Sequence, residues 1–264
     1  MTLTGVRYTG GKSGLKPTGK WVAALVPYGH YYIEPFAGML GVLLQRVPSS
    51  IEIVNDLDGN VTNWWQVVRD KPDDLLKWME HTPAGRRTFY ELAKRLGESN
   101  DDVERAGAFA YVLSLSYLGT GATYSNAGVN SAHPWRGLRN RIEALAARLG
   151  DVMLENTCAL DLLERFVQQR SAVIYCDPPY PRTTTPGLST GEAREFDYGA
   201  MCELLRTAEA RVAVSGLADS GYELPGWHRF ERNVPVLKGN HSRAQPRRVE
   251  TLWTNYPISS NTLF

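Results

Sequence analysis

The stretch Ala172-Val173-Ile174-Tyr175-Cys176-Asp177-Pro178-Pro179-Tyr180 decides the fold. Its first five residues are apolar and β-prone, which indicates a buried strand. The double proline ends that strand, because proline fixes φ and removes the backbone donor. The chain then leaves the sheet in a stiff loop that presents a carboxylate, carbonyl oxygens and an aromatic ring. Open α/β sheets bind their ligands at this carboxyl edge. A simple turn is the alternative interpretation of the motif taken alone.

The rest of the chain alternates between strand and helix patterns. Strands are expected at 31–34, 51–55, 152–154, 211–215, 230–236 and 249–256. Helices are expected through 42–44, over 57–68, from 72, over 86–96, 103–118, 138–149 and 160–168, and from the cap Asp197 to 208. This order predicts an α/β fold with a Rossmann-like, mostly parallel sheet formed by residues 1–63 and 151–264. A helical insert at 64–150 interrupts that sheet.

The composition is typical of a globular protein. Of 264 residues, 43% are hydrophobic and 22% are charged, and Cys158, Cys176 and Cys202 show no metal-ligand spacing. We therefore expect a reduced, cytoplasmic protein with no metal and no membrane segment, and the amino-terminal residues have no apolar core that would make them a signal peptide. The net charge is only +1, but basic residues gather at 229–248. This predicts a positive face for phosphate, with an ordinary solvated surface as the alternative.

A glycine turn and an acidic residue follow the first two expected strands. Phe36-Ala37-Gly38 comes after the strand at 31–34, and Asp56 ends the strand at 51–55. Such a glycine lets a ligand approach the backbone, and the carboxylate can accept hydrogen bonds from ribose hydroxyls. These features fit any adenosine-containing cofactor, NAD and S-adenosylmethionine alike. The G-x-G-x-x-G turn that a dinucleotide-dependent oxidoreductase needs is absent after the first strand.

The loop after the buried strand can handle an amine. The Asp177 carboxylate and a proline carbonyl can accept both hydrogens of an exocyclic amine, while Tyr180 can stack on the base that bears it. An enzyme that acts on the amino group of a flipped nucleobase needs this set of groups.

In their order along the chain, these motifs resemble those of the Dam-type DNA adenine-N6 methyltransferases. The matching segments are Tyr8-Thr9-Gly10-Gly11-Lys12, Glu34-Pro35-Phe36-Ala37-Gly38, Asn55-Asp56, Asp177-Pro178-Pro179-Tyr180 and the closing strand at 248–256. The resemblance extends over nearly the whole chain, from Arg7 to Tyr256.

The resemblance implies a role for each matching residue. Asp177, Pro178 and Tyr180 would handle the target base. S-adenosylmethionine would be bound by Tyr8, Gly11, Lys12, Glu34, Phe36, Gly38, Asp56, Cys158, Ala159 and Asp177. The insert at 64–150 would recognise the target sequence. The residues expected at double-stranded DNA are Tyr117, Thr123, Tyr124, Asn126, Arg136, Arg139, Lys238, Arg243 and Arg247. A monomer, with transient dimers, in the cytoplasm of a bacterial or phage-infected cell is expected.

The sequence departs from the family pattern at two positions. Leu40 stands where the family usually has a second glycine, so we expect a slightly altered turn. Thr123 stands where Dam itself has an arginine that binds a guanine, and arginine to guanine is the commonest specific base contact. A GATC target is therefore not expected. Methylation of cytosine N4, methylation of adenine in RNA, and a DNA-binding module without activity stay open as alternatives.

Overall fold

The computed structural model describes residues 3–6, 18–125, 133–179, 196–235 and 247–258. The strands are β1 (Tyr31–Glu34), β2 (Ile51–Asn55), β3 (Val152–Glu155), β4 (Ala172–Cys176), β5 (Arg211–Leu217), β6 (His228–Pro235) and β7 (Arg247–Thr254). The helices are α1 (Thr18–Leu25), α2 (Gly59–Asp70), α3 (Pro72–His81), α4 (Arg86–Lys94), α5 (Asp102–Leu115), α6 (His133–Arg139), α7 (Ile142–Leu149), α8 (Ala159–Phe166) and α9 (Tyr198–Arg206), with 3₁₀ turns η1 (Leu43–Gln45) and η2 (Tyr117–Gly119).

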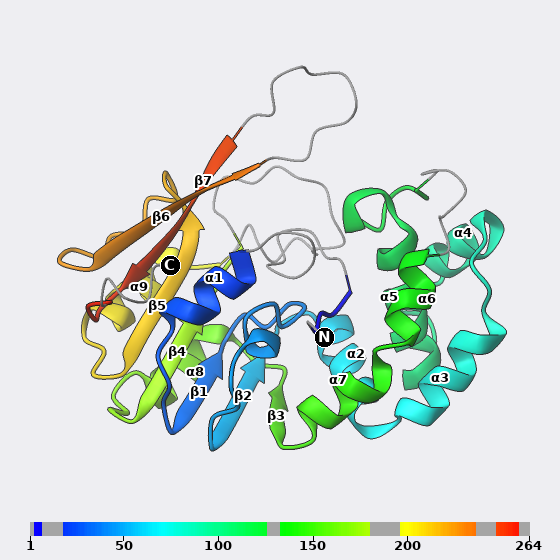
Figure 1. The fold of residues 1–264 in the computed structure, drawn as a ribbon, viewed down its shortest axis with the longest axis horizontal. Coiled ribbons are helices and arrows are strands. Elements are labelled where there is room, and N and C mark those ends of the chain that lie inside the picture. Colours follow the sequence, from blue (N-terminus) through cyan, green and yellow to red (C-terminus); the bar gives the residue numbers. More distant parts are fainter. Residues whose placement is uncertain (1–2, 7–17, 126–132, 180–195, 236–246, 259–264) are drawn as a thin grey trace.

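The described strands form one seven-stranded sheet in the order β3-β2-β1-β4-β5-β7-β6 (Figure 1). Strands β1 to β5 run parallel, while β7 lies antiparallel between β5 and β6. The predicted mostly parallel α/β sheet is therefore confirmed. From β1 the chain proceeds outward to β2 and β3, and it returns to β4 on the other side of β1. The carboxyl ends of β1 and β4 thus form the switch point at which such sheets bind ligands.

Side chains alternate between the two faces of the central strands. Tyr32 and Val173 share a core with α1, η1 and the helices between β2 and β3. Their neighbours Ile33 and Ile174 share a second core with α8 and α9 on the opposite face. Because parallel strands buried on both faces need apolar residues at nearly every position, the short runs of Ile, Val and Tyr in these strands suit this three-layer arrangement.

Helices α2 to α7 come between β2 and β3 and lie beside the β3 edge of the sheet (Figure 1). The carboxylate of Asp58 caps α2 and that of Asp101 caps α5, while Pro72 occupies the first turn of α3. Helix α5 is buried over most of its length, so α2, α3, α4 and α6 pack around it. The apolar residues of these helices belong to the same core as one face of the sheet.

A buried ion pair joins these helices to the sheet. The guanidinium of Arg148 on α7 donates to both carboxylate oxygens of Glu52 on β2, at 2.6 and 2.9 Å. The Arg148 side chain is 13% exposed and that of Glu52 is 5% exposed. The same guanidinium donates to the Leu43 carbonyl oxygen at 3.2 Å. Water therefore solvates neither charge well, and each charged group is stabilised mainly by the other.

Two helix predictions differ from the structure, and one helix of the structure was not predicted. The helix expected through 42–44 is only the 3₁₀ turn η1, because Arg46 is already extended and Pro48 follows closely. The single helix expected over 138–149 is two helices, α6 and α7. The chain tightens between them, where the Arg141 amide donates to the Leu138 carbonyl three residues earlier. Helix α1 was not predicted.

Candidate active site at the carboxyl edge of the sheet

The side chain of Asn55, at the end of β2, connects the loops at this edge. Its amide nitrogen donates to the carbonyl oxygens of Pro35 and Thr157, each at 3.0 Å. Its amide oxygen accepts from the Thr157 backbone N–H at 2.8 Å. Its own carbonyl accepts from the Ala37 N–H at 2.7 Å. Asn55 is buried, so these bonds are shielded from water and fix the loops after β1 and β3 to the end of β2.

The turn after β1 is held from the inside by Asp56. One Asp56 carboxylate oxygen accepts from the Gly38 N–H at 2.7 Å, and the other accepts from the Asp58 N–H at 3.0 Å. The indole N–H of Trp65 donates to the Gly38 carbonyl at 2.8 Å. Gly38 has a φ of +46°, and among the described residues no atom would lie within 4 Å of a Cβ built on it. The turn is therefore fixed on its protein side and open on the other, where a ligand can approach the backbone.

Leu40 keeps the left-handed backbone that a glycine would adopt at this place. Its φ is +52°, and it has the only positive φ among the described non-glycine residues. Its side chain is fully buried in the core beneath the turn. A left-handed conformation costs an L-residue roughly 1–2 kcal/mol, which the burial of the leucine side chain offsets. Leu40 thus adopts a left-handed conformation at the expense of backbone strain.

Glu34, which ends β1, lies beneath this turn with a 1% exposed side chain. Its carboxylate accepts a short hydrogen bond from the Tyr32 hydroxyl and a bond from the Leu43 backbone N–H. Burial raises the pKa of Glu34 to about 8, with the nearby charge of Asp177 adding to the rise. The guanidinium of Arg46 lies 4.3 Å from the centre of the Tyr32 ring. The Glu34 carboxyl group thus forms hydrogen bonds within the protein. Its role in binding the cofactor stays a prediction.

Asp177 follows β4 directly and is half-buried, while Pro178 is buried and Pro179 is exposed. The Pro179 carbonyl accepts from the Tyr198 hydroxyl at 2.6 Å. Strands β1 and β4 pair in parallel, so Glu34 at the end of β1 and Asp177 after β4 lie at neighbouring strand ends. The charge of Asp177 adds to the rise in the pKa of Glu34. The ends of β1 and β4 thus bring the acid of the proline motif next to the glycine turn.

The predicted residues Cys158 and Ala159 lie at the start of α8. Cys158 is half-buried at the N-cap position, and Ala159 is buried as the first residue of the helix. The Asn156 side chain donates to the Asp56 carbonyl at 2.6 Å, which ties this segment to the end of β2. The structure therefore brings this segment to the same edge as Asp56. Phe36 is half-buried there, and its ring meets Phe196 edge-on at 5.2 Å.

The residues predicted at DNA include a hairpin that follows α5. Ser116 pairs with Tyr124 in an antiparallel bridge, and the Tyr117 N–H donates to the Thr123 carbonyl at 2.7 Å. Tyr117 is 48% exposed and Thr123 is exposed. The Tyr124 ring packs against Phe89 on α4.

Two of the predicted arginines lie on α6. Arg136 is exposed and Arg139 is half-buried, while Trp135 and Leu138 are the buried residues of this helix. The two basic side chains therefore lie on the part of α6 that the core leaves to solvent.

The remaining predicted residues cannot be assessed by geometry. Arg247 begins β7, but its side chain is not described. The predicted residues outside the described ranges are Tyr8, Gly11, Lys12, Asn126, Tyr180, Lys238 and Arg243.

Comparison with known proteins identifies the family. The model of the D12 class N6 adenine-specific DNA methyltransferases matches residues 8–211. The chain belongs to this family. Over 256 residues it is 22% identical to the DNA adenine methylase of Vibrio cholerae serotype O1, which covers 92% of this chain and 83% of that protein. Over 274 residues it is 23% identical to the type II methyltransferase M1.LlaDCHI of Lactococcus lactis subsp. cremoris, which covers 95% and 94%.

The predicted resemblance is thus confirmed, and the chain is an adenine-specific DNA methyltransferase. Such an enzyme acts on DNA and requires a methyl donor. Over the ranges that the structure describes, no group of three or more His, Cys, Asp or Glu side chains is arranged to hold a metal ion. None of the helices found there is both long and apolar enough to cross a membrane.

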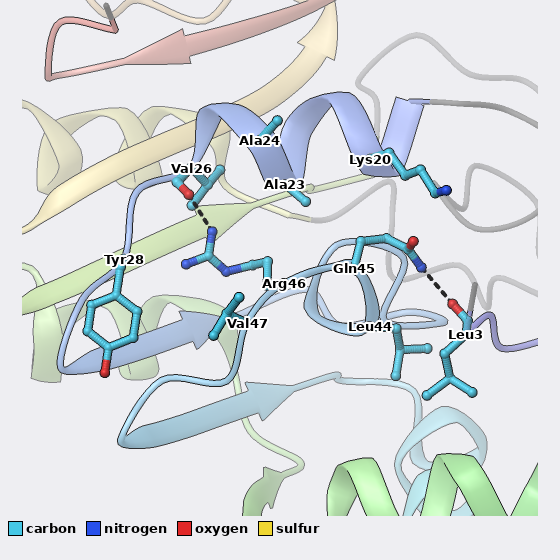
Figure 2. A pocket seen from close by; sticks show the side chains of 10 residues that line it. All are labelled: Leu3, Lys20, Ala23, Ala24, Val26, Tyr28, Leu44, Gln45, Arg46 and Val47. Carbon is cyan, nitrogen blue, oxygen red and sulfur yellow. Dashed lines mark hydrogen bonds between the residues drawn. The ribbon is translucent and has the colours of Figure 1, made fainter. Parts of the chain in front are cut away.

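A groove of about 670 Å³ in this methyltransferase lies elsewhere, between α1 and the segment at 44–47 (Figure 2). Ala23 and Ala24, which line the groove, have small side chains that leave space in it. Two of its polar side chains, those of Gln45 and Arg46, form hydrogen bonds with backbone carbonyl groups. Gln45 donates to the Leu3 carbonyl at 2.6 Å, and Arg46 donates to the carbonyl of Val26. Of the residues predicted for the cofactor or the target base, none that the structure describes lines this groove.

Sequence reasoning missed two residues of the methyltransferase edge. Asn55 was noted only as the neighbour of Asp56, although a polar residue that ends a buried strand is itself a signal of a structural hydrogen bond. Tyr198 had no such signal, because its partner Pro179 is 19 positions away in the sequence.

Proposed function

We propose that this methyltransferase uses S-adenosylmethionine to methylate the N6 amine of an adenine that is flipped out of double-stranded DNA. The observation that carries the proposal is the position of Asp177, directly after β4 and at the switch point beside the open glycine turn. The family requires a methyl donor and an adenine amine, and this edge offers a place for each side by side.

The turn after β1 and the end of β2 fit an adenosyl cofactor. Gly38 leaves its outer side open, so a ligand can lie against the backbone there. The Asp56 carboxylate, which accepts from the backbone N–H groups of Gly38 and Asp58, would also accept hydrogen bonds from ribose hydroxyls. Cys158 and Ala159 border the same edge and would lie along the adenine ring. Bound there, S-adenosylmethionine supplies an electrophilic methyl group.

Asp177 and Pro178 would act on the target amine. The adenine amine is a poor nucleophile, because its lone pair is delocalised into the ring. Hydrogen bonds from its two N–H groups to the Asp177 carboxylate and the Pro178 carbonyl favour a more tetrahedral nitrogen and stabilise the positive charge that develops. The same bonds align the nitrogen with the methyl group. Tyr180 would stack on the flipped base, which offsets on the order of 1–3 kcal/mol of the cost of flipping.

The helical segment at 64–150 would recognise the target sequence. Its hairpin presents the exposed Tyr117 and Thr123, and Arg136 and Arg139 on α6 supply charge for phosphates. Thr123 has no group that can make a bidentate contact with guanine, so we propose a target other than GATC.

The test replaces Asp177 by alanine. Transfer of labelled methyl to duplex DNA should fall by at least about 10²- to 10³-fold, while calorimetric binding of S-adenosylmethionine is retained. Asp219→Ala, which removes an exposed carboxylate in the turn after β5, is the matched control and should transfer methyl at the wild-type rate.

The product is identified by digesting the methylated DNA to nucleosides and measuring their masses by mass spectrometry. Detection of N6-methyl-2′-deoxyadenosine supports the proposal, and detection of N4-methyl-2′-deoxycytidine contradicts it. Near-normal turnover by Asp177→Ala would also refute the assignment of Asp177.

A further inference from the structure

The Asp-Pro-Pro loop has an unusual shortage of hydrogen-bond donors. Neither Pro178 nor Pro179 has a backbone N–H, so neither proline can be held in place by donating a backbone hydrogen bond. Proline rings fix φ at both positions, and the ring of Pro179 also restricts Pro178 to an extended ψ. The ψ of Pro179 has no following proline to restrict it, so the direction of the Pro179 carbonyl depends on donors that reach it from elsewhere in the fold.

Tyr198 supplies one such donor. Its hydroxyl lies 2.6 Å from the Pro179 carbonyl oxygen, although the two residues are 19 positions apart in the sequence. Burial raises the pKa of the Tyr198 phenol, so the hydroxyl keeps its proton and stays a donor at neutral pH. The bond fixes the carbonyl that immediately follows the Pro178 carbonyl, which the proposed function gives to the target amine.

The phenol is itself fixed by its neighbours. Tyr198 opens α9, whose start is capped by the Asp197 carboxylate through the Ala200 N–H at 2.9 Å. The Tyr198 ring meets Phe196 edge-on at 5.1 Å and stacks on Tyr222 at 6.3 Å.

These contacts continue in both directions along the sheet edge. Phe196 meets Phe36 in the turn after β1, and Tyr222 meets Trp253 on β7 at 5.3 Å. Five aromatic rings thus form a row from the glycine turn to β7. The Tyr198 hydroxyl stands in the middle of this row, where it has little freedom to move away from Pro179.

We propose that Tyr198 is a positioning residue of the methyltransferase, which orients the Pro178 carbonyl and Asp177 toward the target amine by holding the Pro179 carbonyl. The inference rests on the proposed function, because it assigns to Tyr198 the orientation of groups that the proposed function uses. Tyr198 itself does not touch the reacting atoms. It acts on the rate of methyl transfer, and it leaves the binding of cofactor and DNA to other residues.

The test removes only the hydroxyl. Tyr198→Phe keeps the ring contacts with Phe196 and Tyr222, and kcat should fall by about ten- to a hundredfold because the acceptor groups are no longer held in line. The Kd for S-adenosylmethionine and the KM for duplex DNA should stay within about twofold of the wild type, since no binding contact is lost. Tyr28→Phe is the matched control, because it removes an exposed hydroxyl whose partner is Ser50 at 3.4 Å. It should leave kcat unchanged.

The readouts are kcat and the single-turnover rate with enzyme in excess, which separates methyl transfer from product release. The concentration of enzyme is counted by titration with S-adenosylmethionine, so an unfolded fraction of Tyr198→Phe cannot imitate a slow chemical step. A wild-type rate for Tyr198→Phe overturns the inference, and so does a loss of cofactor or DNA affinity with an unchanged rate. If Asp177→Ala is inactive while Tyr198→Phe is normal, only this inference fails. If Asp177→Ala is active, the proposed function fails first.

Discussion

Replacing Leu40 by alanine and by glycine should reverse the usual order of stability of these two variants. Both lose the part of the fully buried leucine side chain beyond Cβ, which costs about 2–5 kcal/mol. They differ in the energetic cost of adopting the φ of +52° at this position. Alanine retains a Cβ and with it about 1–2 kcal/mol of left-handed strain. Glycine is free of that strain but loses about 0.4–1 kcal/mol through the greater freedom of its unfolded chain. Leu40→Gly should therefore be more stable than Leu40→Ala by about 1 kcal/mol.

The assay is urea unfolding of the full chain, followed by tryptophan fluorescence. Leu113 in α5 provides the control, because it is equally buried but lies in a regular helix. At that position glycine should be less stable than alanine by about 1 kcal/mol, in the ordinary order. The reasoning is refuted if glycine is also the less stable of the two at Leu40.

Two further changes test the charges that the fold buries. Arg148→Met leaves the Glu52 carboxylate buried without its partner and should cost about 3–5 kcal/mol of unfolding free energy. Arg170→Met, which breaks a surface pair with Glu209, should cost far less, and equal costs would contradict the argument. Burial raises the pKa of Glu34 from 4.5 to about 8, so the folded protein keeps a proton that the unfolded chain releases, and stability should fall as pH rises between these values. Glu34→Gln should lack this part of the decline in urea unfolding followed over pH, and an unchanged slope would show that Glu34 is ionised throughout.

The strands that build the site were predictable because both their pattern and their ends are marked in the sequence. The runs at 31–34, 51–55 and 172–176 are apolar and β-branched or aromatic, and a proline or an acid follows each. The helix pattern at 138–149 was harder, because an apolar periodicity continues across the break between α6 and α7. Only the tightened turn at Asn140 and Arg141 separates them, and neither residue is a strong helix breaker.

Motifs in the sequence mark the candidate residues of the site, but they do not mark the contacts that support those residues. Gly38, Asp56 and Asp177 belong to short sequence motifs, which can be recognised without knowing the conformation of the loops. The hydroxyl of Tyr198 depends on the distance between two segments far apart in the sequence, which no local spacing encodes. Leu40 is an intermediate case: the sequence marked it as a departure from glycine, while only the backbone shows that it takes the left-handed conformation nonetheless.

The hydrogen bonds of Asn55 have a consequence for how the edge of the sheet moves. One buried amide bonds at the same time to Pro35 and to Thr157, so each loop must break a buried hydrogen bond to Asn55 before it can move. The two loops are therefore both held to the end of β2 in the folded protein. Most of the conformational entropy of these loops is lost when the chain folds, so little further entropy is lost when a ligand binds.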